Sequence, residues 1–152
     1  RSDREHCALG GAGGGRMAGS QEVTFEAVAW SDQAADDLTL IADVTPRDLA
    51  VFQERIEADD FQLLEIQYQK ERVGVLIWSV DKEPDGVSLV INAAATHSVL
   101  GLCLFDEILD RFRALGREVG ARSLRCWTQR EGMRLKLEKV GAERRYVMEL
   151  KL

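Results

Sequence analysis

The sequence predicts an α/β (α+β) domain in which helices flank a mixed, mostly antiparallel β-sheet. Three consecutive stretches, 62–70, 73–81 and 87–95, have the apolar patterns of strands and are separated by short turns, which predicts an antiparallel meander. A one-sided apolar stripe over 105–119 predicts a helix that packs on this sheet. The strand-like stretch 123–129 then completes a β-α-β unit, whose two strands should be parallel neighbours in a right-handed crossover.

The segment before the meander predicts one strand and two short helices. Residues 23–30 alternate apolar and polar side chains, as a strand does. Ser31 and Asp32 provide a helix start ahead of a helix over 33–44. Thr45 is suited to the N-cap of a second helix and Pro46 to its first position. The apolar residues at helical spacing in that second helix are Leu49, Phe52 and Ile56.

Turn and cap residues place the remaining boundaries. The first two strands of the meander should turn around Glu71 and Arg72, and residues 83–86 have the composition of the next turn. Gly120 ends the long helix. A last helix carries Met133, Leu137 and Val140 and closes at Gly141. Alternating apolar residues predict a final strand at 144–152, so the expected order is β-αα-βββ-α-β-α-β.

Composition restricts the organisation and the class of partner. With 152 residues the chain can bury one substantial core, and its formal net charge of −6 argues against a nucleic-acid partner. The widely spaced cysteines match neither a disulfide framework nor a zinc site. No apolar run of about 18 residues is present, so we expect no membrane span and a cytoplasmic location.

The first residues differ in composition from the rest of the chain. Residues 1–20 are glycine-rich and offer almost nothing to pack, so we expect them to be disordered and 21–152 to form a single domain. Met17 lies near the end of this segment. Glycine-rich codons upstream of a methionine resemble a translated ribosome-binding site, so we expect the natural chain to start at Met17.

Three stretches of sequence together resemble one protein superfamily. They are VGVLIWSVD at 73–81, VSLVINAAA at 87–95 and LRCWTQREGMRLKLEKVGA at 124–142. Their order, and the spacing R-x-x-M-x-x-K-L-x-x-x-G-A in the third, resemble the GCN5-related N-acetyltransferase (GNAT) superfamily, in particular the small GNAT-like proteins of phage and bacterial genomes. The resemblance covers about residues 21–152. It implies the acyl-CoA N-acyltransferase fold and transfer of an acetyl group from acetyl-CoA to an amine of a small molecule or a protein. Homodimers are common in the family.

The resemblance also implies where acetyl-CoA would bind. In this family the fourth strand and the loop after it hold the coenzyme, with the pyrophosphate at the N-terminus of the next helix, where unpaired backbone N–H groups bind anions. The family motif Q/R-x-x-G-x-G/A reads Ser98-Val99-Leu100-Gly101-Leu102-Cys103 in this chain. Ser98 replaces the basic or amide residue, which implies a weaker site. The implied binding residues are Asn92, Ala93, Ala94, Ala95, Ser98, Val99, Leu100, Gly101, Leu102, Cys103 and Arg130.

The chain departs from the family at the position of its general acid. The tyrosine that protonates the leaving thiolate in many members is Leu137 here, which cannot donate a proton, and a family asparagine falls on Arg130. No catalytic residue and no metal ligand is therefore assigned. Two classes of function stay open. One is an acyl-CoA-dependent N-acyltransferase; the other is a phage-associated GNAT-like binding or assembly module that has lost catalysis.

Several further residues have two interpretations each. His97 is either a general base or a solvated loop residue. Trp78 and Trp127 either line an acceptor pocket or fill the core. Arg130 and Arg134 share one helical face, which either meets the phosphates of the coenzyme or is an ordinary solvated surface.

Overall fold

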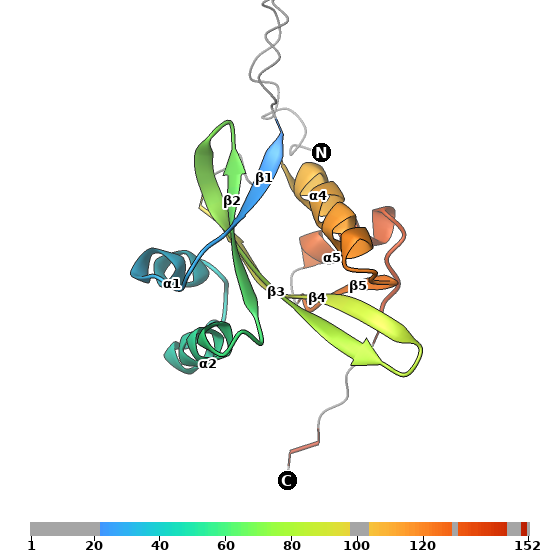
Figure 1. Ribbon diagram of the computed structural model, residues 1–152, viewed down its shortest axis with the longest axis horizontal. Helices are drawn as coiled ribbons and strands as arrows, with labels where there is room; N and C mark the ends of the chain where they lie inside the picture. The colour runs from blue at the N-terminus through green and yellow to red at the C-terminus, as the bar shows by residue number, and fades with distance from the viewer. Residues whose placement is uncertain (1–21, 98–103, 129–130, 146–149, 152) are drawn as a thin grey trace, which may run out of the picture.

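A single five-stranded sheet forms the centre of the structure. The computed structural model describes residues 22–97, 104–128, 131–145 and 150–151 (Figure 1). The elements are β1 (Val23–Ala27), α1 (Asp32–Leu38), α2 (Pro46–Glu57), β2 (Gln62–Tyr68), β3 (Glu71–Glu83), β4 (Gly86–Thr96), α4 (Phe105–Glu118), β5 (Ser123–Cys126) and α5 (Glu131–Lys139). The strands lie in the order β1-β2-β3-β4-β5, and only the β4–β5 pair is parallel. The predicted class and the parallel β-α-β pair are confirmed. Within the described ranges, every helix is too short or too polar to cross a membrane.

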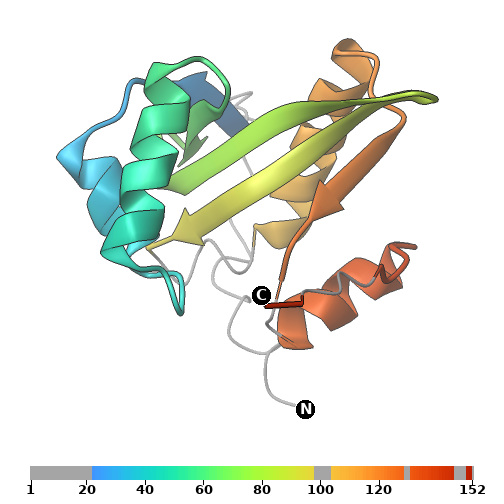
Figure 2. The ribbon, with the colours of Figure 1, turned by 90° about the horizontal axis from the view of Figure 1, so that it is seen from below.

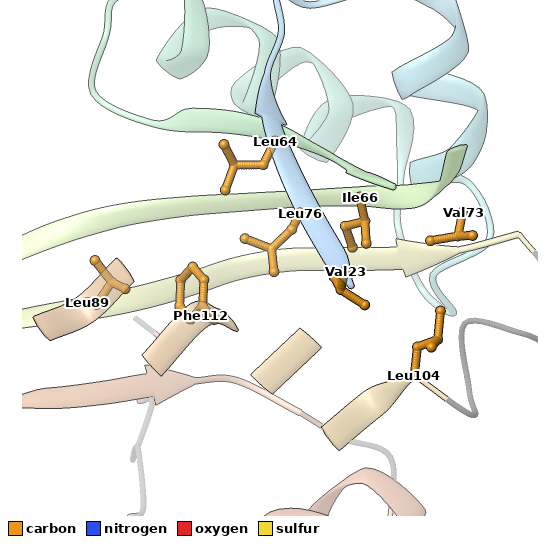
Figure 3. Packing of buried hydrophobic residues seen from close by; sticks show 8 residues of the cluster. All are labelled: Val23, Leu64, Ile66, Val73, Leu76, Leu89, Leu104 and Phe112. Atoms are coloured by element: carbon orange, nitrogen blue, oxygen red, sulfur yellow. The ribbon is translucent and has the colours of Figure 1, made fainter. Parts of the chain in front are cut away.

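Helices cover the two faces of the sheet separately. Figures 1 and 2 show α1 and α2 on one face and α4 on the other. On the first face, Leu38 of α1 packs with Leu63, Val75 and Ile77 of the sheet. On the α4 face, Phe112 is fully buried among Val23, Leu64, Ile66, Val73, Leu76, Leu89 and Leu104 (Figure 3). The apolar stripe predicted for 105–119 therefore forms the α4 side of the core.

The first helix is shorter than the sequence predicts. Ser31 caps it as expected, since its Oγ accepts a hydrogen bond from the backbone N–H of Ala34 at 3.1 Å. The prediction of a helix over 33–44 is wrong beyond Leu38. Thr39 is the C-cap, and Asp43 has a φ of +70°, a left-handed conformation that cannot continue a right-handed helix. Residues 39–44 instead form the connection to α2.

The predicted start of α2 is confirmed and forms a complete capping box. The hydroxyl of Thr45 accepts from the backbone N–H of Asp48 at 3.2 Å, and the Asp48 carboxylate accepts from the Thr45 backbone N–H at 2.8 Å. Pro46 occupies the first helical position. The hydrogen bonds from the Thr45 side chain and backbone lower the pKa of Asp48 below its ordinary value of 3.8.

Thr45→Ala should destabilise the protein in a pH-dependent way. Loss of the cap is expected to cost about 1 kcal/mol near neutral pH. Because the pKa of Asp48 is lower in the folded chain, the stability that its carboxylate contributes is present above the unfolded pKa and is lost as the pH falls through the folded pKa. Urea titrations at about pH 7 and about pH 3 should therefore show the difference between variant and wild type shrinking with acid. An equal difference at both values would contradict this role of Asp48.

Several predicted strand boundaries are wrong. The first strand, predicted over 23–30, ends at Ala27. The β2–β3 turn lies at Gln69 and Lys70, with φ of +52° and +65°, and not at Glu71 and Arg72, which belong to β3. Two left-handed residues suit a two-residue hairpin because they match the twist of the strands. β5 ends at Cys126 and not at 129. In the predicted final strand 144–152, the described residues 144–145 and 150–151 are not in a strand; residues 146–149 and 152 lie outside the described part. A strand requires a paired neighbour, and none is described along the outer edge of β5.

Candidate active site

Strands β4 and β5, the last pair of the described sheet, part partway along β4. Their parallel pairing runs from Ser88 opposite Ser123 to Ile91 opposite Cys126 and stops there. β4 continues to Thr96, paired on its other side with β3. Over residues 92–96, the edge of β4 that faces away from β3 is thus unpaired by any strand of the described chain. An edge of this kind can form hydrogen bonds with an extended ligand as if the ligand were another strand.

A β-bulge marks the point where the strands part. Ile77 lies opposite Ala93 and Trp78 lies opposite Ile91, so Asn92 is the extra residue on β4. Bulges bend a strand and increase its twist. The side chain of Asn92 is held by a hydrogen bond from its Nδ2 to the Oγ of Ser79 at 2.8 Å. The bulge therefore accounts for the divergence of β4 from β5 directly after their last pair.

The backbone of β4 beyond the bulge presents polar groups to the open edge. His97 N–H donates to the carbonyl of Val73 in β3 at 3.1 Å. Since successive residues of a strand direct their hydrogen-bonding groups to alternate sides, the N–H and C=O groups of Ala94 and Thr96 point to the open edge. The methyl group of Ala94 is exposed and leaves that face of the strand uncrowded, whereas Ala93 and Ala95 are buried on the α1 side.

The structure brings together only part of the site that the resemblance implies. Asn92, Ala93, Ala94 and Ala95 lie on the divergent part of β4. The other implied residues, Ser98, Val99, Leu100, Gly101, Leu102, Cys103 and Arg130, lie outside the described residues. Phosphate binding by the loop after β4 therefore stays a prediction.

A charged cluster that the sequence did not reveal holds the end of β4. Arg72 of β3 contacts Asp37 of α1, donates from Nε to Glu65 of β2 at 2.9 Å and lies 3.3 Å from Nε2 of His97 through Nη1. Burial alone would lower the pKa of Arg72, but hydrogen bonds to both carboxylates raise it overall. The four residues are far apart in sequence, and only the strand register and the packing of α1 bring them together.

This cluster also bears on the two interpretations of His97. A guanidinium group can only donate hydrogen bonds, so in a hydrogen bond between Arg72 and His97 the Nε2 atom of His97 is the acceptor. While that contact is made, Nε2 has no free lone pair for a substrate proton. The arrangement favours a positioning role for His97 at the end of β4 over the role of general base.

The two tryptophans near the divergence have different surroundings. Trp78 packs edge-to-face on Phe112 with ring centroids 6.4 Å apart, and this contact favours the interpretation that Trp78 fills the core. Its buried indole N–H has no hydrogen-bond partner among the described residues. Trp127 directly follows β5 and is 67% exposed. A place for Trp127 in an acceptor pocket stays a prediction.

At the last β4–β5 pair and the bulge, the described side chains are those of Ile91, Cys126 and Asn92, none of which is a carboxylate or an imidazole. Burial raises the pKa of the Cys126 thiol, so the thiol is protonated at neutral pH and unsuited to nucleophilic attack. In the described part of the chain, no group of three His, Cys, Asp or Glu side chains is placed to hold a metal ion. What this region offers to a ligand is its backbone, the Asn92 amide and space.

Two arginines of the C-terminal region, Arg134 in α5 and Arg144 after it, are paired with carboxylates. Arg134 bonds to Glu131 and to Glu138 at 3.1 Å each, and Arg144 bonds to Glu138 at 3.0 Å. The hydrogen bond from Arg144, with that from Arg134, lowers the pKa of Glu138. For Arg134 these pairs support the solvated-surface interpretation; Arg130 is outside the described residues. Lys136 lies 5.4 Å from the ring centroid of Phe105 and connects α5 to the start of α4.

Comparison with known proteins gives matches in structure and none in sequence. No model of a protein family and no curated protein matches the chain. A ribosomal-protein-alanine N-acetyltransferase from Brucella melitensis biovar Abortus 2308 superposes with a TM-score of 0.66 at 17% identity, covering 86% of this chain and 98% of that one. A transcriptional regulator from Bacillus halodurans C-125 superposes with a TM-score of 0.63 at 18% identity, covering 86% of this chain and 99% of that chain.

A third solved structure carries a ligand. The acetyltransferase AAC(6')-Iy, in complex with the bisubstrate analog CoA-S-monomethyl-acetylneamine, gives a TM-score of 0.61 at 11% identity and covers 86% of this chain and 99% of that chain. At these identities the likeness concerns the fold. The chain has the GNAT fold, as the resemblance in its sequence implied.

Proposed function

We propose that this chain, with its GNAT fold, transfers an acyl group from acyl-CoA, foremost acetyl-CoA, to an amine of a small molecule or a protein. The observation that carries the proposal is the divergence of β4 from β5 after Ile91 and Cys126. It leaves an open edge along the second half of β4, beside a bulge. An extended ligand with amide groups, such as the pantetheine arm, is complementary to such an edge.

The residues present fit this ligand. When bound, acyl-CoA supplies the acyl group as a thioester. The backbone groups of Ala94 and Thr96 would hold its amides, and the exposed methyl of Ala94 leaves room for the arm. Asn92, fixed by Ser79, positions the strand at the bulge. The acceptor nitrogen forms a bond to the acyl carbon as the carbon–sulfur bond breaks; its proton leaves to solvent and the released thiolate takes one up.

No side chain is proposed as the acid that serves the leaving thiolate. Leu137 lies half-buried on α5 and cannot provide a proton. Proton transfer through water is slower than transfer from a positioned acid, by a factor of about 10² to 10⁴. We therefore expect slow turnover. Binding of acetyl-CoA without any turnover would instead favour the binding-module alternative.

Ala94→Trp should block acyl-CoA binding. An indole at this exposed position would occupy the space beside the open edge without displacing a buried side chain. Calorimetry of the full chain with acetyl-CoA should show binding for wild type and binding weaker by about tenfold or more, a loss of at least about 1.4 kcal/mol, for the variant.

Val80→Trp is the matched control for this experiment. Val80 is 40% exposed, on the part of β3 that pairs with β4 toward the hairpin turn, away from residues 92–96. Its substitution should leave acetyl-CoA affinity unchanged. No heat with wild type at millimolar ligand would end the proposal, and equal affinity in wild type and Ala94→Trp would place the ligand elsewhere. Release of free coenzyme A in the presence of amines then separates the enzyme from the binding module.

A further inference from the structure

A hollow lies next to the start of β2, which is two strands away from β4 in the order of the sheet. It has a volume of about 210 Å³ and is formed by the chain leaving β1, the C-terminal end of α2 and the start of β2. Its lining residues are Val28, Ala29, Trp30, Ile56, Glu57, Asp59, Phe61, Gln62 and Leu63. Sites for drug-sized molecules measure about 300–1,000 Å³. A hollow of this size suits a single side chain.

Hydrogen bonds hold the walls of the hollow in place. The backbone N–H of Val28 donates to the carbonyl of Leu63 at 3.1 Å, which fixes the chain leaving β1 against β2. The N–H of Phe61 donates to the carbonyl of Arg55 at 3.1 Å, which fixes the α2–β2 connection. Leu63 and the half-buried apolar residues belong to the α1-side core. The hollow is therefore preformed and loses little conformational entropy on binding.

The lining is aromatic and negatively charged. Trp30 and Phe61 are half-buried, Glu57 and Asp59 are exposed, and the lining contains no Lys or Arg. The C-terminal end of α2 adds the negative end of its dipole. Aromatic faces and carboxylates both attract cations.

The basic residue nearest to the two lining carboxylates is paired with another carboxylate. Arg55, the basic residue at the end of α2, pairs with Asp60 at 2.9 Å. Glu57 accepts a hydrogen bond from the neutral Nε2 of Gln53 at 2.9 Å. In the described ranges, no ion pair involves Glu57 or Asp59. A cationic ligand would supply the counter-charge that both carboxylates lack.

We infer that this hollow binds the guanidinium group of an arginine side chain on a partner peptide or protein. A guanidinium group stacks its flat face on aromatic rings while the N–H groups at its edge donate to carboxylates, and it is more weakly hydrated than an ammonium group. Trp30 and Phe61 supply the aromatic surface, and Glu57 and Asp59 supply the acceptors. This site does not depend on acyl transfer, since it lies at β1 and β2 and not at β4.

Nuclear magnetic resonance of the full chain can test the inference. The three tryptophans give three indole N–H signals, of which Trp30 reports on the hollow and Trp127 on the β4–β5 divergence. The probe is a blocked Ala-Arg-Ala peptide, compared with the same peptide carrying lysine or citrulline, the uncharged isostere of arginine. The arginine peptide should shift the Trp30 signal saturably, lysine more weakly and citrulline not at all.

Variants separate this site from general attraction to an acidic protein. Glu57→Gln combined with Asp59→Asn should weaken arginine binding by about fivefold or more, because two ion pairs are lost. Glu54→Gln removes one exposed charge from the same helix outside the hollow and should leave binding unchanged. Three results would overturn the inference: equal signal shifts with the arginine and citrulline peptides, a shift of the Trp127 signal instead of the Trp30 signal, or a loss of affinity in Glu54→Gln equal to that in the double variant. Equal affinity for the lysine peptide would overturn the guanidinium specificity.

Discussion

Phe112→Ala is expected to lower the free energy of unfolding by about 4 kcal/mol. Phe112 is completely buried and is the most deeply buried side chain of α4, with edge-to-face contacts to Phe25 and Trp78 at ring-centroid distances of 6.3 Å and 6.4 Å. Truncation removes the apolar area of the ring and leaves a cavity that rigid strands on one side cannot close. It also removes two aromatic pairs.

Chemical denaturation in urea, followed by circular dichroism, measures this change. Leu135→Ala is the control, because Leu135 is 47% exposed on α5 and its truncation should cost less than about 0.5 kcal/mol. The slope of the denaturation curve should not change, since the same surface becomes exposed. A loss at Phe112 no larger than that at Leu135 would show that α4 does not pack on the sheet through this ring.

Gly74→Ala is expected to lower the free energy of unfolding by about 3 kcal/mol. The substituted residue lies beside the end of β4, at the candidate site. A Cβ atom at this position would lie 2.1 Å from the carbonyl oxygen of Ala95, a backbone atom that no side-chain rotation can move. Gly74 pairs with Thr96 at the end of β4, so the strands must separate to admit the methyl group. The reason is steric, because the φ of Gly74 is not in the left-handed region.

Gly132→Ala is the matched control for Gly74→Ala. Gly132 lies in α5, and a Cβ there meets nothing within 4 Å. Alanine should raise helix stability by up to about 1 kcal/mol at such a position. If acyl-CoA uses the open edge of β4, Gly74→Ala should also weaken acetyl-CoA binding, whereas Gly132→Ala should not. A stable Gly74→Ala variant would show that β3 and β4 approach each other less closely than described.

Local patterns in the sequence predicted most of the elements. The capping pair Thr45 and Pro46, the stripe that includes Phe112 and the turn before Gly86 each act within a few residues, so the signal and its structural effect lie in the same short stretch. The small residues of β4 belong to the resemblance that predicts a candidate site on this strand, and that site stays a prediction.

Other features depended on contacts between distant parts of the chain. Asp43, Gln69 and Lys70 have left-handed conformations although none of the three is a glycine. They lie where the structure departs from the predicted end of the first helix and from the predicted β2–β3 turn. The trio of Arg72, Asp37 and Glu65 exists because α1 and two strands converge. Periodicity contains no information on such convergence, because it describes which face a residue occupies and not which residue lies across from it.

The sequence by itself thus determined the kinds and the order of the elements from β1 to α5 and the faces they bury, whereas the strand on which a ligand would lie stays a prediction. Tertiary structure decided where β4 leaves β5, through a bulge at Asn92 that is defined only against the register of β3. It also decided that Trp30, Glu57, Asp59 and Phe61 line one hollow. The physical reason is the same in both cases: hydrophobic periodicity is a property of a single segment, whereas a strand edge or a hollow is formed by how several segments pack together.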